Sequence, residues 1–283
     1  MNGRRLTVAL VVAAGLLMGS VADPIGAQEG VQRYVRYRHL GSTAYGVVRG
    51  EVVQQLSGPP YDSPSATGVE VALADVTLLA PAEPSKVIAV GLNYLSHLGG
   101  VPPSEYPGLF AKLPTSIVGP DAAIEIPPDA GNVHYEGELV VIIGKMARDV
   151  SPEEARDFIF GVTAGNDVSE RDWQGDDLQW FRAKAADTFG PIGPAIVTGL
   201  DYNDLHVQTR VNGELRQSES SADLLFGVDE IVSYVSRYVT LLPGDLIFTG
   251  TPGSTQPMQP GDVVEIEVAG VGVLRNTVAR KGS

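Results

Sequence analysis

Two glutamates and an aspartate are the residue types from which a divalent-metal site can be built. Glu136 and Glu138 stand two positions apart in the run 133–143, and Asp167 follows further along the chain. That run predicts a strand, and side chains at positions i and i+2 of a strand point to the same face. Neighbouring buried carboxylates repel each other and resist desolvation, and a bound cation relieves both costs. Oxygen ligands suit Mg²⁺ or Mn²⁺, with Ca²⁺ as the alternative, rather than zinc. On spacing alone, the competing interpretation is the solvated face of an ordinary strand.

The elements that must position these carboxylates are mostly short strands. Apolar runs and alternating patterns predict strands at 45–48, 87–90, 138–143, 195–197, 246–249 and 263–268. Asn212-Gly213 between two strand-like runs predicts a two-residue hairpin. A capping box at 151–154 predicts a helix that runs toward Phe160, and apolar positions at helical spacing predict a second helix over 228–238. Few helices among many strands indicate a β-rich α+β fold.

The composition excludes several classes of function. The 283 residues include 34 acidic and 20 basic side chains, and the net charge of −14 argues against nucleic acid and anionic membranes as partners. The chain has no cysteine, which excludes disulfides, thiolate metal ligands and a cysteine nucleophile. Any negatively charged substrate must therefore be attracted by local cations against the overall field of the protein.

The N-terminus has the pattern of an export signal. Arg4 and Arg5 precede a short apolar run and then small residues, so we expect residues 1–27 to be a signal peptide and the protein to be periplasmic or secreted. The run is short for a membrane span, and no integral membrane domain is expected, although an uncleaved anchor is the alternative. A proline-rich stretch at 81–85 indicates a linker, which divides the rest into a small domain, 28–82, and a catalytic domain, 83–283.

A series of motifs in a fixed order resembles the fumarylacetoacetate hydrolase (FAH) family. The matching segments are 90–97, 110–116, 135–139, 165–172, 182–191, 211–214, 249–252, 260–267 and 272–276. The resemblance implies an FAH-type mixed β-sandwich roll with a small N-terminal β-rich domain, usually as a homodimer. It also implies that Glu136, Glu138 and Asp167 are the metal ligands.

The resemblance assigns roles to five further side chains. Lys184 is the cation at a developing enolate, and Arg171 is similar to the family's contact with the substrate carboxylate. Gln174 and Thr251 resemble polar contacts of the substrate. His97 is the candidate general base, since histidine titrates near neutral pH. The other three histidines, His39, His134 and His206, are interpreted as structural.

One departure from the family pattern affects the predicted reaction. Many members have a glutamate three residues after this histidine, whereas this chain has Gly100, and Glu105 is the nearest replacement. The expected substrate is a small 2-keto acid, either acylpyruvate-like or a 2-hydroxy-enoate, cleaved by C–C hydrolysis through a metal-stabilised enolate. The alternative is a decarboxylase or isomerase of 2-keto dicarboxylic acids, of the 5-oxopent-3-ene-1,2,5-tricarboxylate or 2-hydroxyhepta-2,4-diene-1,7-dioate type. A second alternative is an exported, non-catalytic carboxylate-binding protein.

Overall fold

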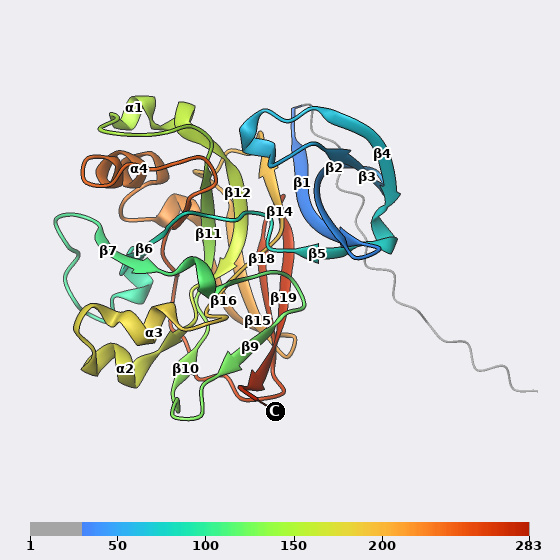
Figure 1. The fold of residues 1–283 in the computed structure, drawn as a ribbon. Helices are drawn as coiled ribbons and strands as arrows, with labels where there is room; N and C mark the ends of the chain where they lie inside the picture. The colour runs from blue at the N-terminus through green and yellow to red at the C-terminus, as the bar shows by residue number, and fades with distance from the viewer. Residues whose placement is uncertain (1–29, 283) are drawn as a thin grey trace, which may run out of the picture.

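The computed structural model describes residues 30–282, and the predicted signal peptide, residues 1–27, lies outside this range. The described chain is β-rich, with small helices at the edges of its sheets (Figure 1). The strands are β1 Gln32–His39, β2 Ser42–Arg49, β3 Val52–Leu56, β4 Ala66–Ala72, β5 Thr77–Leu79, β6 Val87–Gly91, β7 Gly108–Lys112, β8 Ile117–Val118, β9 Ala123–Ile126, β10 Val133–His134, β11 Gly137–Ile143, β12 Ile159–Asn166, β13 Ser169–Glu170, β14 Gly190–Thr198, β15 His206–Val211, β16 Glu214–Ser220, β17 Leu246–Phe248, β18 Val263–Val268 and β19 Gly272–Arg280.

The helices are short. The α-helices are α1 Pro152–Ala155, α2 Arg171–Asp176, α3 Phe181–Ala185 and α4 Val228–Ser236. The 3₁₀ turns are η1 Pro60–Asp62, η2 Leu73–Asp75, η3 Leu95–His97, η4 Pro114–Ser116, η5 Arg156–Phe158, η6 Leu178–Trp180 and η7 Ser221–Asp223. No helix within residues 30–282 is long and apolar enough to cross a membrane.

Two mixed sheets form the body of the molecule. The larger sheet has the strand order β4-β3-β2-β1-β14-β12-β11-β17-β6-β7, and the smaller one has the order β16-β15-β18-β19-β9. Strands β11, β12 and β14 contact β15, β18 and β19, so the two sheets pack face to face. The small N-terminal unit, β1 to β5, extends the larger sheet because β1 pairs with β14 (Figure 1). The structure thus has the expected β-rich α+β fold of the FAH type with a small N-terminal domain.

Strand β11 lies at the centre of the larger sheet and is buried along its whole length. Leu139, Val141 and Ile143 belong to the main core, which includes residues of the smaller sheet. Val140 and Ile142 face the other side, where they pack in a second apolar cluster. A central strand covered on both faces has a continuous apolar sequence. By the two-residue alternation, Glu138 falls on the face of Val140 and Ile142, away from the smaller sheet.

Most sequence-predicted elements are confirmed, with corrections at their ends. The hairpin is present, because Val211 pairs with Glu214 across two residues with positive φ. The predicted strand 133–143 is interrupted after His134, since β10 pairs with β13 whereas β11 pairs with β12.

Both predicted helices are shorter than expected. The first one stops at Ala155 as an α-helix, because Ile159 already pairs with Ile143 in the larger sheet. The second helix, α4, buries Ile231 and Val235 as predicted. Tyr238 lies beyond its end and is 70% exposed, so it is not a core residue.

Candidate active site

Paired backbones bring the three predicted carboxylates together. Strands β11 and β12 are antiparallel, with Gly137 opposite Asn166. Glu136 and Asp167 therefore meet just beyond the paired ends, where the Asp167 amide donates to the Glu136 carbonyl at 2.8 Å. The side chain of Asn166 also accepts a hydrogen bond from the Glu136 amide at 2.9 Å. As a result, carboxylate oxygens of Glu136, Glu138 and Asp167 lie within 4.8 Å of one another.

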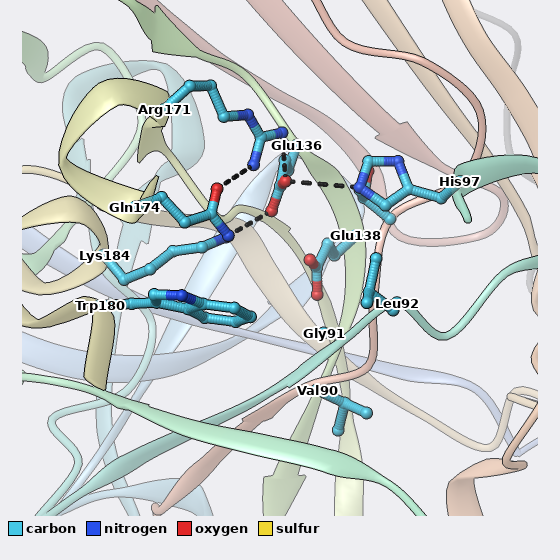
Figure 2. Close-up of a pocket in the computed structure, with 11 residues that line it drawn as sticks. Val90, Gly91, Leu92, His97, Glu136, Glu138, Arg171, Gln174, Trp180 and Lys184 are labelled. Atoms are coloured by element: carbon cyan, nitrogen blue, oxygen red, sulfur yellow. Dashed lines mark hydrogen bonds and ion pairs between the residues drawn. The ribbon is translucent and has the colours of Figure 1, made fainter. Parts of the chain in front are cut away.

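Cationic side chains from two short helices meet two of these carboxylates. The Lys184 ammonium, from α3, donates to Glu136 Oε2 and to Asp167 Oδ2, both at 2.7 Å. Arg171 begins α2 and donates through Nη2 to Glu136 Oε1 at 2.5 Å and through Nη1 to Gln174 Oε1 at 2.7 Å. Figure 2 shows Arg171, Gln174 and Lys184 gathered on one side of Glu136.

The local field perturbs the titration of the buried groups in opposite directions. Burial alone would raise the pKa of Glu136, but the cations Lys184 and Arg171 hold that pKa well below its usual range. Burial opposes the charge of Lys184, yet Asp167 and Glu136 outweigh it and raise its pKa. Glu138 differs, because burial and the neighbouring charges of Asp167 and Glu136 raise its pKa well above 4.5.

His97 approaches Glu136 from the opposite side (Figure 2). Its Nε2 lies 3.7 Å from Glu136 Oε1, while its Nδ1 is 2.5 Å from the carbonyl oxygen of Gly253. A carbonyl can only accept, so Nδ1 carries a proton, and in the neutral ring Nε2 keeps the lone pair. Glu105 is exposed and does not line the cavity beside His97. The backbone of Gly253, rather than a carboxylate, therefore orients this imidazole.

Thr251 is more constrained than the sequence indicates. Its hydroxyl donates to the Gly137 carbonyl at 2.9 Å and accepts from Gln217 Nε2 at 2.8 Å. The only proton of this hydroxyl is thus already donated to a backbone carbonyl, and this hydrogen bond joins the loop after β17 to the start of β11. Thr251 lines the cavity, but it must rotate before it can donate to a substrate.

All eight predicted site residues converge on one place. Seven of them line a cavity of about 190 Å³, and Asp167 lies behind Lys184. The cavity is completed by residues that sequence reasoning did not select, chiefly Val90, Leu92 and Trp180. Trp180 adopts a left-handed conformation, φ 56°, and its ring stands edge-on to Phe110 at 5.4 Å. Lone apolar residues give no sequence signal for such a role.

Two buried or half-buried polar groups near the site were also missed. Lys112 is fully buried and donates to Asp167 Oδ1 at 2.6 Å. A lysine that ends an apolar strand segment was the available signal. His134 Nδ1 forms a hydrogen bond with Thr255 Oγ1 at 2.9 Å. The same hydroxyl oxygen accepts a hydrogen bond from Arg171 Nη2 at 2.8 Å. This histidine therefore supports Arg171 from behind, and burial, followed by the nearby charge of Arg171, lowers its pKa to about 4.

The donor set fits a hard divalent cation. Among residues 30–282, Glu138 forms no ion pair, although it faces two other carboxylates and is 1% exposed. Within the described chain its carboxylate accepts one hydrogen bond, from the Gly250 amide to Oε2 at 2.7 Å. An unpaired buried carboxylate is strongly unfavourable unless a cation neutralises it. Three carboxylates without nitrogen or sulfur donors select ions such as Mg²⁺ or Mn²⁺.

Comparisons with known proteins agree with this geometry. Residues 86–279 match the family described as fumarylacetoacetate (FAA) hydrolase C-terminal, and residues 32–81 match one described as Rv2993c-like, N-terminal. A crystal structure of 5-carboxymethyl-2-hydroxymuconate delta-isomerase from Mycobacterium smegmatis is 46% identical with a TM-score of 0.84, and the match covers 88% of this chain and 99% of that one.

Two further relatives bear on the chemistry. The mitochondrial oxaloacetate tautomerase FAHD2B of Bos taurus is 38% identical over 259 residues, or 86% of this chain and 79% of that protein. Maleylpyruvate hydrolase from Sphingobium sp. SYK-6, in complex with manganese (II) ion and pyruvate, is 28% identical with a TM-score of 0.72, covering 88% of this chain and 99% of that one.

The expectation of an exported protein is wrong. The bovine relative is a mitochondrial enzyme, and this finding contradicts the expected periplasmic or secreted location. A basic pair before a short apolar run is a weak signal, because basic N-terminal segments also direct proteins to other destinations.

Proposed function

This chain belongs to the fumarylacetoacetate hydrolase family, and from that premise we propose that it is a divalent-metal-dependent keto–enol isomerase of a small 2-keto dicarboxylic acid. The observation that best supports this reaction is the arrangement around Glu136. Lys184 contacts one side of that carboxylate and the His97 ring faces the other (Figure 2). A base and a cation therefore flank the same small volume, which is what proton transfer next to a keto group requires.

Glu136, Glu138 and Asp167 are the proposed ligands of Mg²⁺ or Mn²⁺, with Ca²⁺ as the alternative. A bound ion supplies Lewis-acid polarisation of the 2-keto group and stabilises the negative charge of the enolate. The manganese in the related maleylpyruvate hydrolase supports this assignment.

The side chains of the chain perform the remaining steps. The Arg171 guanidinium and Gln174 bind a substrate carboxylate, for which Arg171 exchanges its contact with Glu136. His97 Nε2 takes a proton from the carbon next to the keto group, and the electron pair of that C–H bond becomes the C=C bond of the enolate. Two of the three ammonium protons of Lys184 are donated to the carboxylates of Glu136 and Asp167, so the third can be donated to the enolate oxygen. In the reverse reaction the enol O–H proton returns to Lys184, the C=O bond re-forms, and His97 returns its proton to the carbon.

Isomerisation is preferred over hydrolysis because of what surrounds His97. Hydrolysis needs an activated water in addition to the enolate, and Gly100 offers no carboxylate to pair with the imidazole. The names of two relatives, an oxaloacetate tautomerase and a hydroxymuconate isomerase, support the same reaction class. Hydrolysis is the second candidate, since the Gly253 carbonyl can hold the imidazole in place of a glutamate. Decarboxylation of a 2-keto dicarboxylate would instead break the C–C bond to the departing carboxylate and form the enolate of the shorter keto acid, which the same cations would stabilise.

The test is turnover of enol-oxaloacetate and of acetylpyruvate, with Mn²⁺, with Mg²⁺ and with chelator. We expect metal-dependent loss of the enol absorbance above the uncatalysed rate, and neither acetate from acetylpyruvate nor carbon dioxide above background. His97→Asn should lower kcat by about 10²-fold or more. Lys184→Met should lower it by about 10²-fold, whereas Lys145→Met, which removes an exposed lysine, should not change it.

Each alternative has its own result in that assay. Acetate plus pyruvate from acetylpyruvate would identify a hydrolase, and carbon dioxide from oxaloacetate a decarboxylase. Tight binding of oxaloacetate without any product would identify a carboxylate-binding protein and refute the enzyme.

Two structural proposals accompany this function. We propose a homodimer, which light scattering of the purified protein tests directly. We also propose the domain division 28–82 and 83–283, which limited proteolysis near the proline-rich segment 81–85 would test. Because β1 pairs with β14, the two parts should remain associated after cleavage.

A further inference from the structure

Lys112 is a buried cation that the proposed reaction does not use. It is the last residue of β7, and its side chain has no exposed surface. Its ammonium donates to Asp167 Oδ1 at 2.6 Å, to the carbonyl of Lys184, and to the carbonyl of Val168 at 3.5 Å. An ammonium has three protons, so these three acceptors use all of them. Lys112 also does not line the cavity. It therefore has no free proton to donate to a substrate and no direct contact with one.

The two oxygens of Asp167 are held by two different lysines. The Lys112 ammonium donates to Oδ1, and the Lys184 ammonium donates to Oδ2. Lys184 also donates to Glu136, so Oδ2 is the oxygen on the side of Glu136. Two hydrogen bonds from opposite sides fix the rotation of the carboxylate plane. Asp167 consequently directs Oδ2, rather than both oxygens, to the side of the cluster where Glu136 lies.

Strand β7 also supports Lys184. Phe110 and Lys112 stand two positions apart on β7 and thus point to the same face. The Phe110 ring lies 4.8 Å from Lys184 Nζ, and Lys112 binds the Lys184 carbonyl. That carbonyl belongs to the last turn of the five-residue helix α3, where carbonyls have no helical partner. A cation there stabilises the helix end and fixes the point from which the Lys184 side chain extends.

We propose that Lys112 is a positioning residue of the metal centre, which turns one oxygen of Asp167 toward the site and anchors the end of α3 that carries Lys184. This inference rests on the proposed function in one respect, because it takes Glu136, Glu138 and Asp167 to be the metal ligands. It predicts that metal binding depends on the geometry of Lys112 as well as on its charge.

Charge and position predict opposite effects of removing this ammonium. Loss of a positive charge next to a cation site should tighten metal binding, since the remaining carboxylates attract the ion more strongly. Loss of the contact that orients Asp167 should weaken binding, because a ligand must then be reordered. The direction of the change in metal affinity therefore separates the two roles, and neither role needs turnover to be measured.

The experiment is Mn²⁺ titration of the full chain without substrate, with free Mn²⁺ measured by electron paramagnetic resonance. Lys112→Met should raise the Kd for Mn²⁺ by about 10- to 100-fold, while Lys145→Met, at an exposed position, should leave it unchanged. Tighter binding by Lys112→Met would overturn the proposal in favour of a simple counter-charge. An unchanged Kd with a lower unfolding temperature in chelator would overturn it in favour of packing alone.

A second variant keeps the test decisive if Lys112→Met does not fold. Lys112→Arg retains the charge, but a planar guanidinium cannot reach the same three acceptors. The proposal predicts weaker Mn²⁺ binding by Lys112→Arg and an altered spectrum of the bound ion, and an unchanged Kd would overturn it. Failure of the wild-type protein to bind Mn²⁺ would overturn the metal centre itself, whereas wild-type Mn²⁺ binding without enol turnover would refute the isomerase and leave the role of Lys112 standing.

Discussion

Replacing Glu138 with glutamine should make the metal-free protein more stable near neutral pH and abolish its stabilisation by Mn²⁺. Glu138 is buried, lies against Glu136 and Asp167, and forms no ion pair within the described chain. Glutamine has the same shape and no charge, and its amide can donate to the neighbouring carboxylates. The substitution therefore removes an electrostatic conflict and, at the same time, one proposed metal ligand.

The size of this effect follows from the raised pKa of Glu138. Burial, together with Asp167 and Glu136, raises the pKa of this carboxyl well above its ordinary value of 4.5 in the folded protein. The unfolded chain releases the proton near that value, so stability falls as the pH rises from there toward the folded-state pKa. Each pH unit over which the folded carboxyl stays protonated while the unfolded one is ionised costs about 1.4 kcal/mol. Glutamine avoids this loss.

The assay is urea unfolding of both proteins in chelator, close to the unfolded-state pKa and near neutral pH, and then with saturating Mn²⁺. The stability advantage of Glu138→Gln should be small at the lower pH and should grow toward neutral pH, by at most about 1.4 kcal/mol per pH unit. Mn²⁺ at about 100 times its Kd should stabilise the wild type by about 2.7 kcal/mol and the variant far less. Glu51→Gln, at an exposed carboxylate, is the matched control. An advantage that does not grow with pH, or a Mn²⁺ shift that survives in Glu138→Gln, would refute the reasoning.

Three other substitutions have defined outcomes. Trp180→Ala should enlarge the cavity and lower the kcat/KM preference for short over long 2-keto acids about tenfold, and an unchanged ratio would remove Trp180 from substrate selection. Burial lowers the pKa of His134 from its ordinary 6.5 to about 4, so the folded protein loses stability as the pH falls from 6.5 to 4. In His134→Asn, the free energy of unfolding measured with urea should fall less over this pH range. Gly100→Glu should lower stability by about 1 kcal/mol in urea melts, because Gly100 has a φ of +92° that a side chain disfavours; an unchanged stability would contradict this.

Local patterns were sufficient for much of the fold. The Asn212-Gly213 hairpin forms because both residues take the positive φ angles that such a turn requires. The capping box of Ser151 and Glu154 begins a helix as predicted. The ends of elements were less predictable, since the pairing of Ile159 with Ile143 replaced helix by strand. That competition depends on a partner strand outside the local window.

The sequence by itself determined the residue types on which the proposed chemistry depends. The spacing of two predicted Glu136 and Glu138 on one face, and ordered motifs predicted Asp167 and Lys184 as their companions. Those inferences depend on backbone periodicity and residue type, which are properties of short segments.

Only the tertiary structure decided how those residues act. Within residues 30–282 it showed Glu138 without an ion pair, and His97 held by the Gly253 carbonyl, 156 positions further along the chain. It also placed the Lys112 ammonium against the carboxylate of Asp167, although Lys112 precedes Asp167 by 55 positions in the chain. Periodicity specifies the face of an element but not which element will cover it. The electrostatic state of a buried carboxylate depends on that covering element, and so on the packing of the whole domain.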